Sequence, residues 1–353
     1  MKKINATCAV FMMVAALIGC GEDEYSTVQS TVIEEEAKVN SEKARIETEE
    51  EIASRAKQQV EIAKAKAEAQ KMYENSEMVM NGEVGEVGVA STTRKDILIP
   101  AYVYFPKNYN AEESYPMVVM FAGFSSDHDN GTGFIDVTRE MNKNGIVVVQ
   151  YDNPGYGKSS ETNLAYTFEN VKNDALDVIN YVKGNYNIGK VGAFGYDVGG
   201  RIVMELQVEK LYDFDQIELL GPYCETSDFI QECFGDKNWD ELKAEAKDNG
   251  WVKYADQEYS YQWFTGWETN DANLTDDFCK EYKNKRLMLV YSIKDDCVNP
   301  LTMQKIFRQT GAAAIELTST GHDLGVWRPE SPKETAQIVI DQSAGFMKDL
   351  IDS

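Results

Sequence analysis

The stretch that most constrains the fold is residues 190–204, KVGAFGYDVGGRIVM. Its pattern predicts a short buried strand over 190–194, a tight turn, and a helix from Gly199 onward. The turn has the frame G-x-D-x-G with Asp197 at its centre. Glycines on both sides are expected because a Cβ atom there would collide with the adjacent strand or helix. The stretch therefore predicts an aspartate held above the end of a strand.

Strand and helix patterns alternate along the rest of the chain. The other predicted strands are residues 87–93, 96–105, 116–122, 145–151, 216–220, 286–292 and 314–318. The other predicted helices are residues 134–144, 167–183, 301–309 and 332–350. Runs such as PMVVMFA are apolar throughout, which is typical of parallel strands buried on both faces. The alternation predicts an α/β fold with a doubly wound, mostly parallel sheet.

Composition excludes some classes of function. The formal net charge is −24 and the sequence pI is near 4.5, which argues against nucleic-acid binding because phosphate contacts need clustered Lys and Arg. The chain has two histidines and no close pair of cysteines, so we expect no metal site and no cofactor. Beyond the N-terminal region, four cysteines allow three disulfide pairings, among which the sequence does not choose. They are Cys224, Cys233, Cys279 and Cys297.

The N-terminus has the pattern of an export signal. Lys2 and Lys3 precede an apolar run over 9–18, and a small residue then stands before Cys20. The run is short for a membrane span. The pattern resembles the lipobox of bacterial lipoproteins, which implies cleavage after residues 1–19, lipid (palmitate among the acyl groups) on Cys20, and a membrane-anchored location in the cell envelope. An ordinary signal peptide is the alternative.

Residues 20–80 form the next predicted region. Within it, residues 28–73 are rich in Glu, Lys, Ala and Gln and lack Pro and Gly, which favours a long exposed helix of roughly 70 Å. One apolar stripe recurs every seven residues, whereas the second stripe of a coiled coil is poor. We favour a solvated spacer helix, with a coiled-coil stalk that forms homo-oligomers as the alternative. The stripe comprises Val32, Val39, Ile46, Ala53, Val60 and Ala67.

A long connection, about residues 225–285, interrupts the predicted main domain of residues 81–353. It is unusually aromatic, which favours a lid over a binding cleft; a small satellite core that uses aromatics only for packing is the alternative. The aromatic residues are Trp239, Trp251, Tyr254, Tyr259, Tyr261, Trp263, Phe264 and Trp267.

Four further motifs follow predicted strands in order. They are GFSS at 123–126, DNPGYGKS at 152–159, KDDCV at 294–298 and TGH at 320–322. With the turn around Asp197, these motifs resemble those of α/β-hydrolases, closest in layout to esterases and dienelactone-hydrolase-like enzymes. The resemblance extends from about Asp96 to the C-terminus.

The resemblance implies a role for particular residues. Asp197 stands in the nucleophile position of the G-x-S-x-G elbow, His322 in that of the base, and Asp295 in that of the acid that orients it, with Asp296 as the alternative acid. The histidine activates water and the carboxylate fixes its tautomer. His128 is interpreted as a loop residue. The expected oxyanion-hole donors are the N–H groups of Phe124 and Val198.

An aspartate at the elbow is similar to haloalkane and fluoroacetate dehalogenases and epoxide hydrolases. There the carboxylate attacks an sp³ carbon and an alkyl ester forms, which activated water hydrolyses. A carboxylate that attacked an ester would instead give a high-energy anhydride. The chain departs from those enzymes in having FAGFS at 121–125 and Val198 after the nucleophile. We therefore expect hydrolysis of a small or medium organic substrate, with a catalytically silent, esterase-like binding or scaffold module as the alternative.

Overall fold

The computed structural model describes residues 79–81, 83–124, 126, 133–234, 239–255, 257–269, 273–282, 286–325 and 333–352. All of them belong to one compact unit, Lys64–Ser353. The predicted signal segment 1–19, the lipidation site Cys20 and nearly all of the predicted helical region 20–80 lie outside the described residues, as does His128. Among the described residues, no helix is long and apolar enough to cross a membrane.

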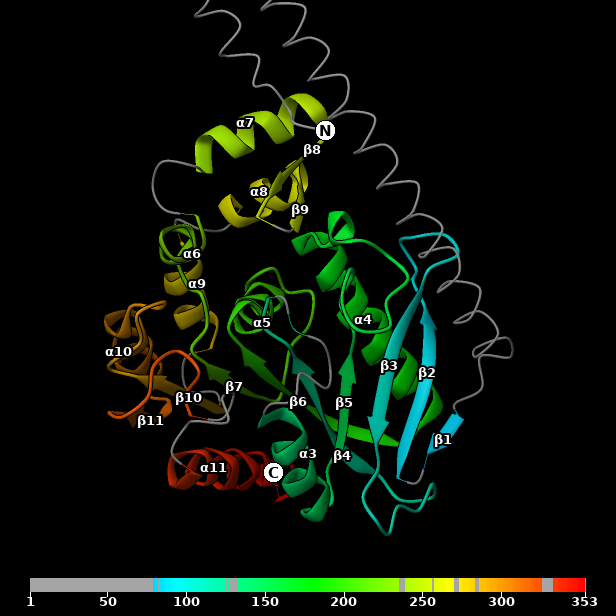
Figure 1. Cartoon of the computed structure of the whole chain (residues 1–353). Coiled ribbons are helices and arrows are strands. Elements are labelled where there is room, and N and C mark those ends of the chain that lie inside the picture. The colour runs from blue at the N-terminus through cyan, green and yellow to red at the C-terminus, as the bar shows by residue number, and fades with distance from the viewer. Residues whose placement is uncertain are drawn as a thin grey trace, which may run out of the picture. The chain divides into compact units, whose positions relative to one another are not determined.

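The described part of the chain is built on a nine-stranded sheet with the order β1-β2-β3-β5-β4-β6-β7-β10-β11 (Figure 1). From β5 to β11 every neighbouring pair is parallel, whereas β1, β2 and β3 are antiparallel additions at one edge. The mostly parallel sheet predicted from the sequence is confirmed. The strands are β1 (Val79–Asn81), β2 (Val84–Ala90), β3 (Leu98–Tyr104), β4 (Tyr115–Phe121), β5 (Val147–Tyr151), β6 (Ile188–Tyr196), β7 (Gln216–Leu220), β10 (Arg286–Ser292) and β11 (Ala313–Leu317).

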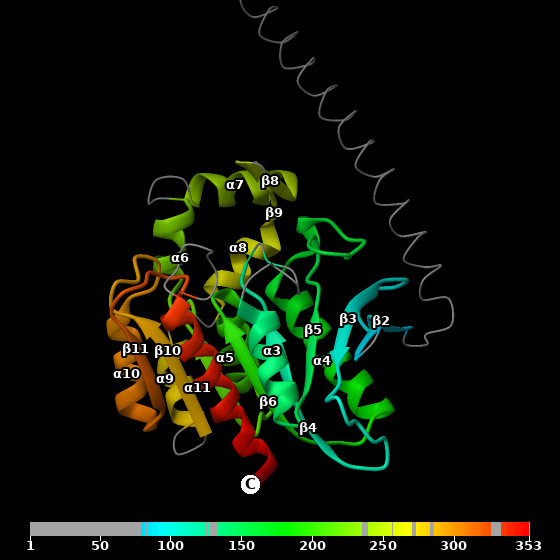
Figure 2. The ribbon, with the colours of Figure 1, turned by 60° about the horizontal axis from the view of Figure 1, so that its bottom comes forward.

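Helices cover both faces of this sheet. On one face, α3 (Gly133–Lys143) and α11 (Lys333–Asp352) pack against each other (Figure 2). On the other face lie α4 (Phe168–Asn185), α5 (Val198–Val208), α9 (Leu274–Glu281) and α10 (Pro300–Thr310). Apolar side chains accordingly form two buried clusters, one under each helix layer, with Phe134 and Met347 in the first and Ala175 and Ile202 in the second.

Predicted boundaries differ from the observed ones mainly at turns. The strand expected over 87–93 ends at Ala90, because the chain turns before β3 and Asp96 adopts a positive φ of 60°. The helix expected from 301 begins at Pro300, where proline suits the first helical position and Asn299 caps the end. The strands expected at 216–220 and 286–292 coincide with β7 and β10.

The connection between β7 and β10 contains further helices and a separate two-stranded sheet beyond the ends of the central strands (Figures 1 and 2). Its buried aromatics, among them Phe229, Trp239 and Trp263, belong to the same apolar cluster as α4 and α5. The connection therefore does not have an isolated core of its own. Its elements before α9 are α6 (Thr226–Cys233), α7 (Trp239–Asn249), β8 (Trp251–Tyr254), β9 (Gln257–Ser260) and α8 (Tyr261–Glu268).

Candidate active site

Asp197 occupies a strained turn between β6 and α5. Its backbone has φ 55° and ψ −126°, a conformation that is uncommon for a residue with a side chain. A Cβ atom on Gly195 would lie 2.7 Å from Gly200 Cα, and one on Gly199 would lie 2.2 Å from the Phe121 carbonyl oxygen. Both glycines are thus required by close backbone approach, as the sequence predicted.

The two oxygens of the Asp197 carboxylate have different surroundings. Oδ2 accepts a hydrogen bond from the Phe124 N–H at 2.8 Å. A Cβ atom on Gly123 would lie 2.5 Å from the same oxygen, so only glycine leaves room for it there. Val198 follows as the first residue of α5, where N–H groups have no partner within the helix. The loop after β4 thus binds the carboxylate at the place where the sequence predicted an oxyanion hole.

His322 lies between two carboxylates. Its Nδ1 is 3.0 Å from Asp295 Oδ2, and its Nε2 is 3.7 Å from Asp197 Oδ1. The other oxygen of Asp295 accepts the N–H groups of Cys297 and Val298 at 2.9 and 2.8 Å. The structure therefore brings together the three residues proposed from the sequence, and Asp295 rather than Asp296 contacts the imidazole.

The electrostatics of His322 follow from this position. Burial of the ring lowers its pKa, but Asp197 and Asp295 raise it more strongly, and the resulting pKa is about 10. The ring is therefore an imidazolium at neutral pH. Tyr196 packs beside it with ring centroids 5.5 Å apart, and burial followed by the charges of Asp197, Asp323 and Asp295 raises the pKa of its phenol.

Aromatic side chains surround the Phe124 ring. Tyr166, which the sequence reasoning missed, packs edge-on with centroids 5.2 Å apart, and Trp263 of α8 lies at 5.8 Å. Both are 1 % exposed, and the Tyr166 hydroxyl and Trp263 Nε1 have no hydrogen-bond partner among the described residues. Nothing in the sequence around Tyr166 forms a recognisable motif. The other rings within 6.3 Å belong to Tyr156, Phe229 and Tyr259.

Arg201 connects the elbow helix to the β7–β10 connection. The side chain is fully buried, and its Nε donates to Glu205 Oε1 at 3.0 Å. Its Nη2 donates to the Trp267 carbonyl at the end of α8 at 2.8 Å. Because Arg201 lies four residues after Asp197 on the same helix, it ties the position of α8 to that of the elbow.

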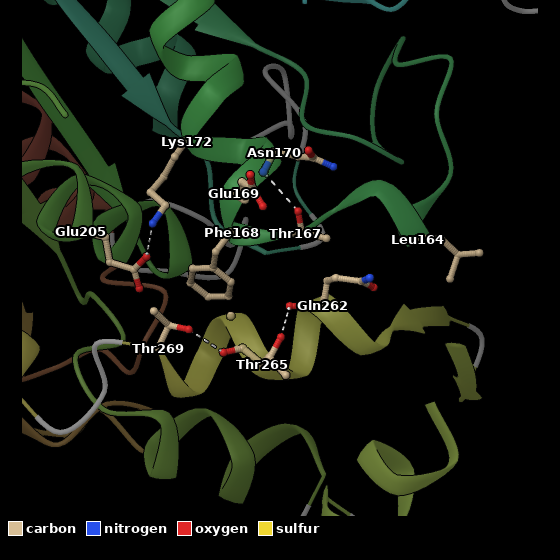
Figure 3. Close-up of a pocket in the computed structure, with 11 residues that line it drawn as sticks. Leu164, Thr167, Phe168, Glu169, Asn170, Lys172, Glu205, Gln262, Thr265 and Thr269 are labelled. Carbon is tan, nitrogen blue, oxygen red and sulfur yellow. Dashed lines mark hydrogen bonds and ion pairs between the residues drawn. The ribbon is translucent and has the colours of Figure 1, made fainter. Parts of the chain in front are cut away.

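A cavity of about 510 Å³ lies elsewhere, between α8 and the start of α4 (Figure 3). Figure 3 shows the Phe168 ring among the side chains that line the cavity, and Lys172 reaches Glu205 at 3.1 Å. Asp197, Asp295 and His322 do not line it, so this cavity is not the space around the candidate catalytic residues. Its lining residues are Leu164, Thr167, Phe168, Glu169, Asn170, Lys172, Glu205, Gln262, Thr265, Gly266 and Thr269.

The chain is similar in sequence to one protein family and in fold to many solved structures. A family model described as serine aminopeptidase, S33, matches residues 113–246. No curated protein sequence matches the chain at a significant level. Among solved structures, Est1E from Butyrivibrio proteoclasticus with bound ferulic acid is 18% identical, with a TM-score of 0.62 over 76% of this chain and 100% of that chain.

Two further structures are similar at equally low identity. The α/β hydrolase GrgF from Penicillium sp. sh18 is 13% identical, with a TM-score of 0.59 over 76% of this chain and 99% of that chain. The esterase PF2001 from Pyrococcus furiosus is 14% identical, with a TM-score of 0.53 over 79% of this chain and 96% of that chain. At such identities the similarity is one of fold.

Proposed function

We propose that this chain is an α/β-hydrolase that hydrolyses a small or medium organic substrate through Asp197, His322 and Asp295, by an alkyl-ester intermediate of the epoxide or halide type. The observation that carries the proposal is the orientation of the Asp197 carboxylate. One oxygen is bound by the Phe124 N–H and the other faces His322. These positions assign a separate task to each oxygen.

In the first step, Oδ1 of Asp197 attacks an sp³ carbon of the substrate. A carbon–oxygen ester bond forms as the carbon–halogen or epoxide carbon–oxygen bond breaks, and the electron pair of that bond leaves with the halide or the alkoxide oxygen. Tyr166 and Trp263 supply buried donors near Phe124 for this developing charge. A carboxylic ester is a poorer substrate than a halide or an epoxide for two reasons. The Phe124 N–H already donates to Oδ2 of Asp197 and is not available to the ester carbonyl, and attack by a carboxylate on the ester would give an anhydride.

Formation of the ester changes the state of His322. The ester is neutral, so the ring loses one of its two stabilising charges. At 3.7 Å and an effective dielectric constant of about 20, one carboxylate charge stabilises the imidazolium by about 4.5 kcal/mol, or about 3 pKa units. The pKa of His322 thereby falls from about 10 to about 7. The ring then gives its proton to the alkoxide of an opened epoxide, or to solvent after loss of a halide, and can accept another at neutral pH.

In the second step, neutral His322 takes a proton from water, which attacks Cγ of Asp197. The negative charge moves to Oδ2, which the Phe124 N–H already binds and the Val198 N–H supports from the start of α5. Collapse of the tetrahedral intermediate releases the alcohol, whose oxygen takes the proton from His322, and leaves Asp197 as a carboxylic acid. The acid then gives its proton to His322, which restores the carboxylate and the imidazolium of the resting state. Asp295 holds the ring through Nδ1 during both proton transfers.

The β7–β10 connection serves as the lid in this proposal. Tyr259 stacks on the Phe124 ring at 6.3 Å and Trp263 lies 5.8 Å from it, so residues of the connection pack against the side chain of the residue whose N–H binds Asp197. Aromatic surroundings of this kind favour an apolar or aromatic substituent on the substrate. Exclusion of water by these rings strengthens the electrostatic interactions beneath them.

Trapping the intermediate tests the mechanism. In His322→Gln the first step proceeds but the ester is not hydrolysed, so incubation with a panel of epoxides and alkyl halides should add the substrate mass to the intact protein. Peptide mapping should place the adduct on Asp197. Asp197→Asn is the matched control and should gain no mass, because an amide oxygen is a poor nucleophile. Absence of any adduct in His322→Gln across the panel would count against the alkyl-ester mechanism.

A silent, esterase-like binding module is the second candidate. Two observations favour it. The Asp197 carboxylate already accepts the Phe124 N–H, one of the predicted oxyanion-hole donors, and His322 lies between the carboxylates of Asp197 and Asp295 in the resting structure. Asp197→Ser separates the two. If this variant gains activity on activated aryl esters while the natural chain forms no alkyl adduct, the chain is a binding module derived from an esterase.

The location of the protein is proposed from the sequence alone. Residues 1–19 would be removed, Cys20 would carry the lipid, and the helix predicted within 20–80 would hold the hydrolase away from the membrane, as a spacer or as an oligomeric stalk. Cys20→Ala should leave the chain soluble or unprocessed. A mature-sized Cys20→Ala chain that still fractionates with membranes would contradict the lipid anchor.

A further inference from the structure

Cys297 is placed beside the His322–Asp295 pair by the turn that follows β10. One oxygen of Asp295 accepts the backbone N–H groups of Cys297 and Val298, which fixes this turn against the carboxylate. Ligand atoms of Asp295, Cys297 and His322 all lie within 4.8 Å of one another. The thiol is not in a disulfide, and the residue is partly exposed. This cluster could not be predicted from the sequence, because His322 lies on a different loop.

We propose that Asp295, Cys297 and His322 bind a divalent cation of the zinc type. Thiolate, imidazole and carboxylate are the three donors that zinc combines in proteins, whereas calcium and magnesium prefer oxygen alone. Three protein ligands leave the fourth tetrahedral position for water. The ligand set is therefore that of an accessible zinc site rather than a closed structural one.

The required movement is small. Zinc–ligand distances of about 2.0–2.3 Å place tetrahedral donors about 3.5 Å apart. Nδ1 of His322 and Oδ2 of Asp295 are already 3.0 Å apart, so an ion has to separate this pair slightly and draw in the Cys297 sulfur. A rotation about the Cys297 side chain, which now directs Sγ toward Asp296 Oδ1 at 3.6 Å, can supply most of the change.

Local charge favours a cation at this place. Asp197 and Asp295 flank the ring, and Asp296 lies beside the thiol. Asp323 follows His322 directly in the chain. Burial raises the pKa of the nearby Tyr196 phenol, and Asp323 together with Asp197, Asp295 and Cys297 raises it further, so all four negative groups act on the same place. Binding releases the proton of the thiol and that of the ring to solvent, and the ion replaces them with two positive charges amid several carboxylates.

Occupancy would remove the proposed catalytic base. When Nδ1 of His322 is bound to the metal, the neutral ring carries its remaining proton on Nε2, so Nε2 has no lone pair to accept a proton from water, and Asp295 no longer orients the ring. This consequence rests on the proposed function, whereas metal binding itself does not. The site would thus make the hydrolase sensitive to free zinc.

Cobalt and zinc binding test the proposal on the full chain. With Co²⁺, the natural protein should show a near-ultraviolet thiolate-to-cobalt charge-transfer band together with the visible bands of a four-coordinate site. Cys297→Ser should lose the charge-transfer band, and its zinc affinity by calorimetry should fall at least about tenfold. His322→Gln should weaken zinc binding to a similar extent. Asp296→Asn, which alters a neighbouring carboxylate outside the donor set, should keep the band.

The outcomes decide between a site and a general attraction of cations. Circular dichroism should show the same fold in all three variants, so a lost band reports a lost ligand. A natural protein without the band, or a Cys297→Ser chain that binds zinc as tightly as the natural one, would overturn the proposal. Loss of binding in Asp296→Asn equal to that in Cys297→Ser would overturn it as well, since charge alone would then account for binding.

Discussion

The charge state of His322 can be measured directly, and the structure gives the size of the effect. The ring lies between Asp197 and Asp295, and burial of the ring is outweighed by these two carboxylates, so its pKa is about 10. Asp197→Asn removes one charge at 3.7 Å from Nε2 and keeps the shape of the side chain. With an effective dielectric constant of about 20, this lowers the pKa of His322 by about 3 units, to about 7.

Imidazole resonances provide the assay. The chain has only two histidines, so a nitrogen–proton correlation spectrum of histidine-labelled protein contains two ring systems, and His128→Gln assigns them. In the natural protein His322 should keep its imidazolium shifts through neutral pH and titrate near pH 10. In Asp197→Asn it should titrate near pH 7. Asp136→Asn removes an exposed carboxylate on α3 and should leave the titration unchanged.

The result also bears on the mechanism. A raised pKa in the folded state means that the ring contributes stability in full below its ordinary pKa of 6.5, and this contribution is lost as the pH rises through about 10. If His322 titrates near 6.5 in the natural protein, or if Asp197→Asn leaves it near 10, Asp197 does not control the ring. The proposed change of His322 from acid to base on ester formation would then be refuted.

Three further predictions concern buried groups around the sheet and the elbow. Burial raises the pKa of Glu218 from 4.5 to about 8, so its contribution to stability is lost as the pH rises between these values. Measured by urea unfolding at pH 5 and pH 9, the natural chain should lose about 4 kcal/mol of unfolding free energy relative to Glu218→Gln, and an equal change in both chains would refute this. Arg201→Met removes a positive charge beside the buried Glu205 carboxylate and should lower the unfolding free energy by about 3 kcal/mol. The double variant with Glu205→Met should lose less, because no buried charge is left without its partner. A cost below about 1 kcal/mol for Arg201→Met would show that the ion pair is dispensable. Gly123→Ala places a Cβ atom 2.5 Å from Asp197 Oδ2, so it should lower the unfolding free energy more in the natural chain than in an Asp197→Ser background. The difference between the two backgrounds, measured in a double-mutant cycle, should be about 1 kcal/mol; equal costs in both would mean that the carboxylate does not need this space.

Features that depend on neighbouring residues could be predicted from the sequence. The glycines around Asp197 report a backbone constraint within one turn, and the structure shows contacts of 2.2 and 2.7 Å that enforce it. The alternation of strand and helix patterns along the chain predicted β7 and β10 with their observed bounds. The order of the motifs placed Asp295 and His322 at the same edge of the sheet, because parallel strands all end there.

Features that depend on contacts between distant segments could not be predicted. The pairing of Asp295 rather than Asp296 with His322 depends on how the turn after β10 folds, since both are carboxylates in the same motif. Cys297 and Tyr166 stand in no recognisable pattern, and only the packed fold brings one to His322 and the other to the Phe124 ring. The charge state of His322 could not be predicted either, because its pKa is raised by Asp197 and Asp295, which lie 125 and 27 positions away in the sequence.

The identity of residue 197 carries more information in the structure than in the sequence. In sequence, aspartate in a serine frame is equally consistent with a different nucleophile and with a lost one. In the structure, Oδ2 has a backbone donor at 2.8 Å and a glycine whose missing Cβ leaves room for it, while Oδ1 faces His322. Each oxygen thus has a place suited to its charge, and a carboxylate that forms an ester through one oxygen keeps the other on its donor. The proposed alkyl-ester mechanism rests on this division of tasks between the two oxygens.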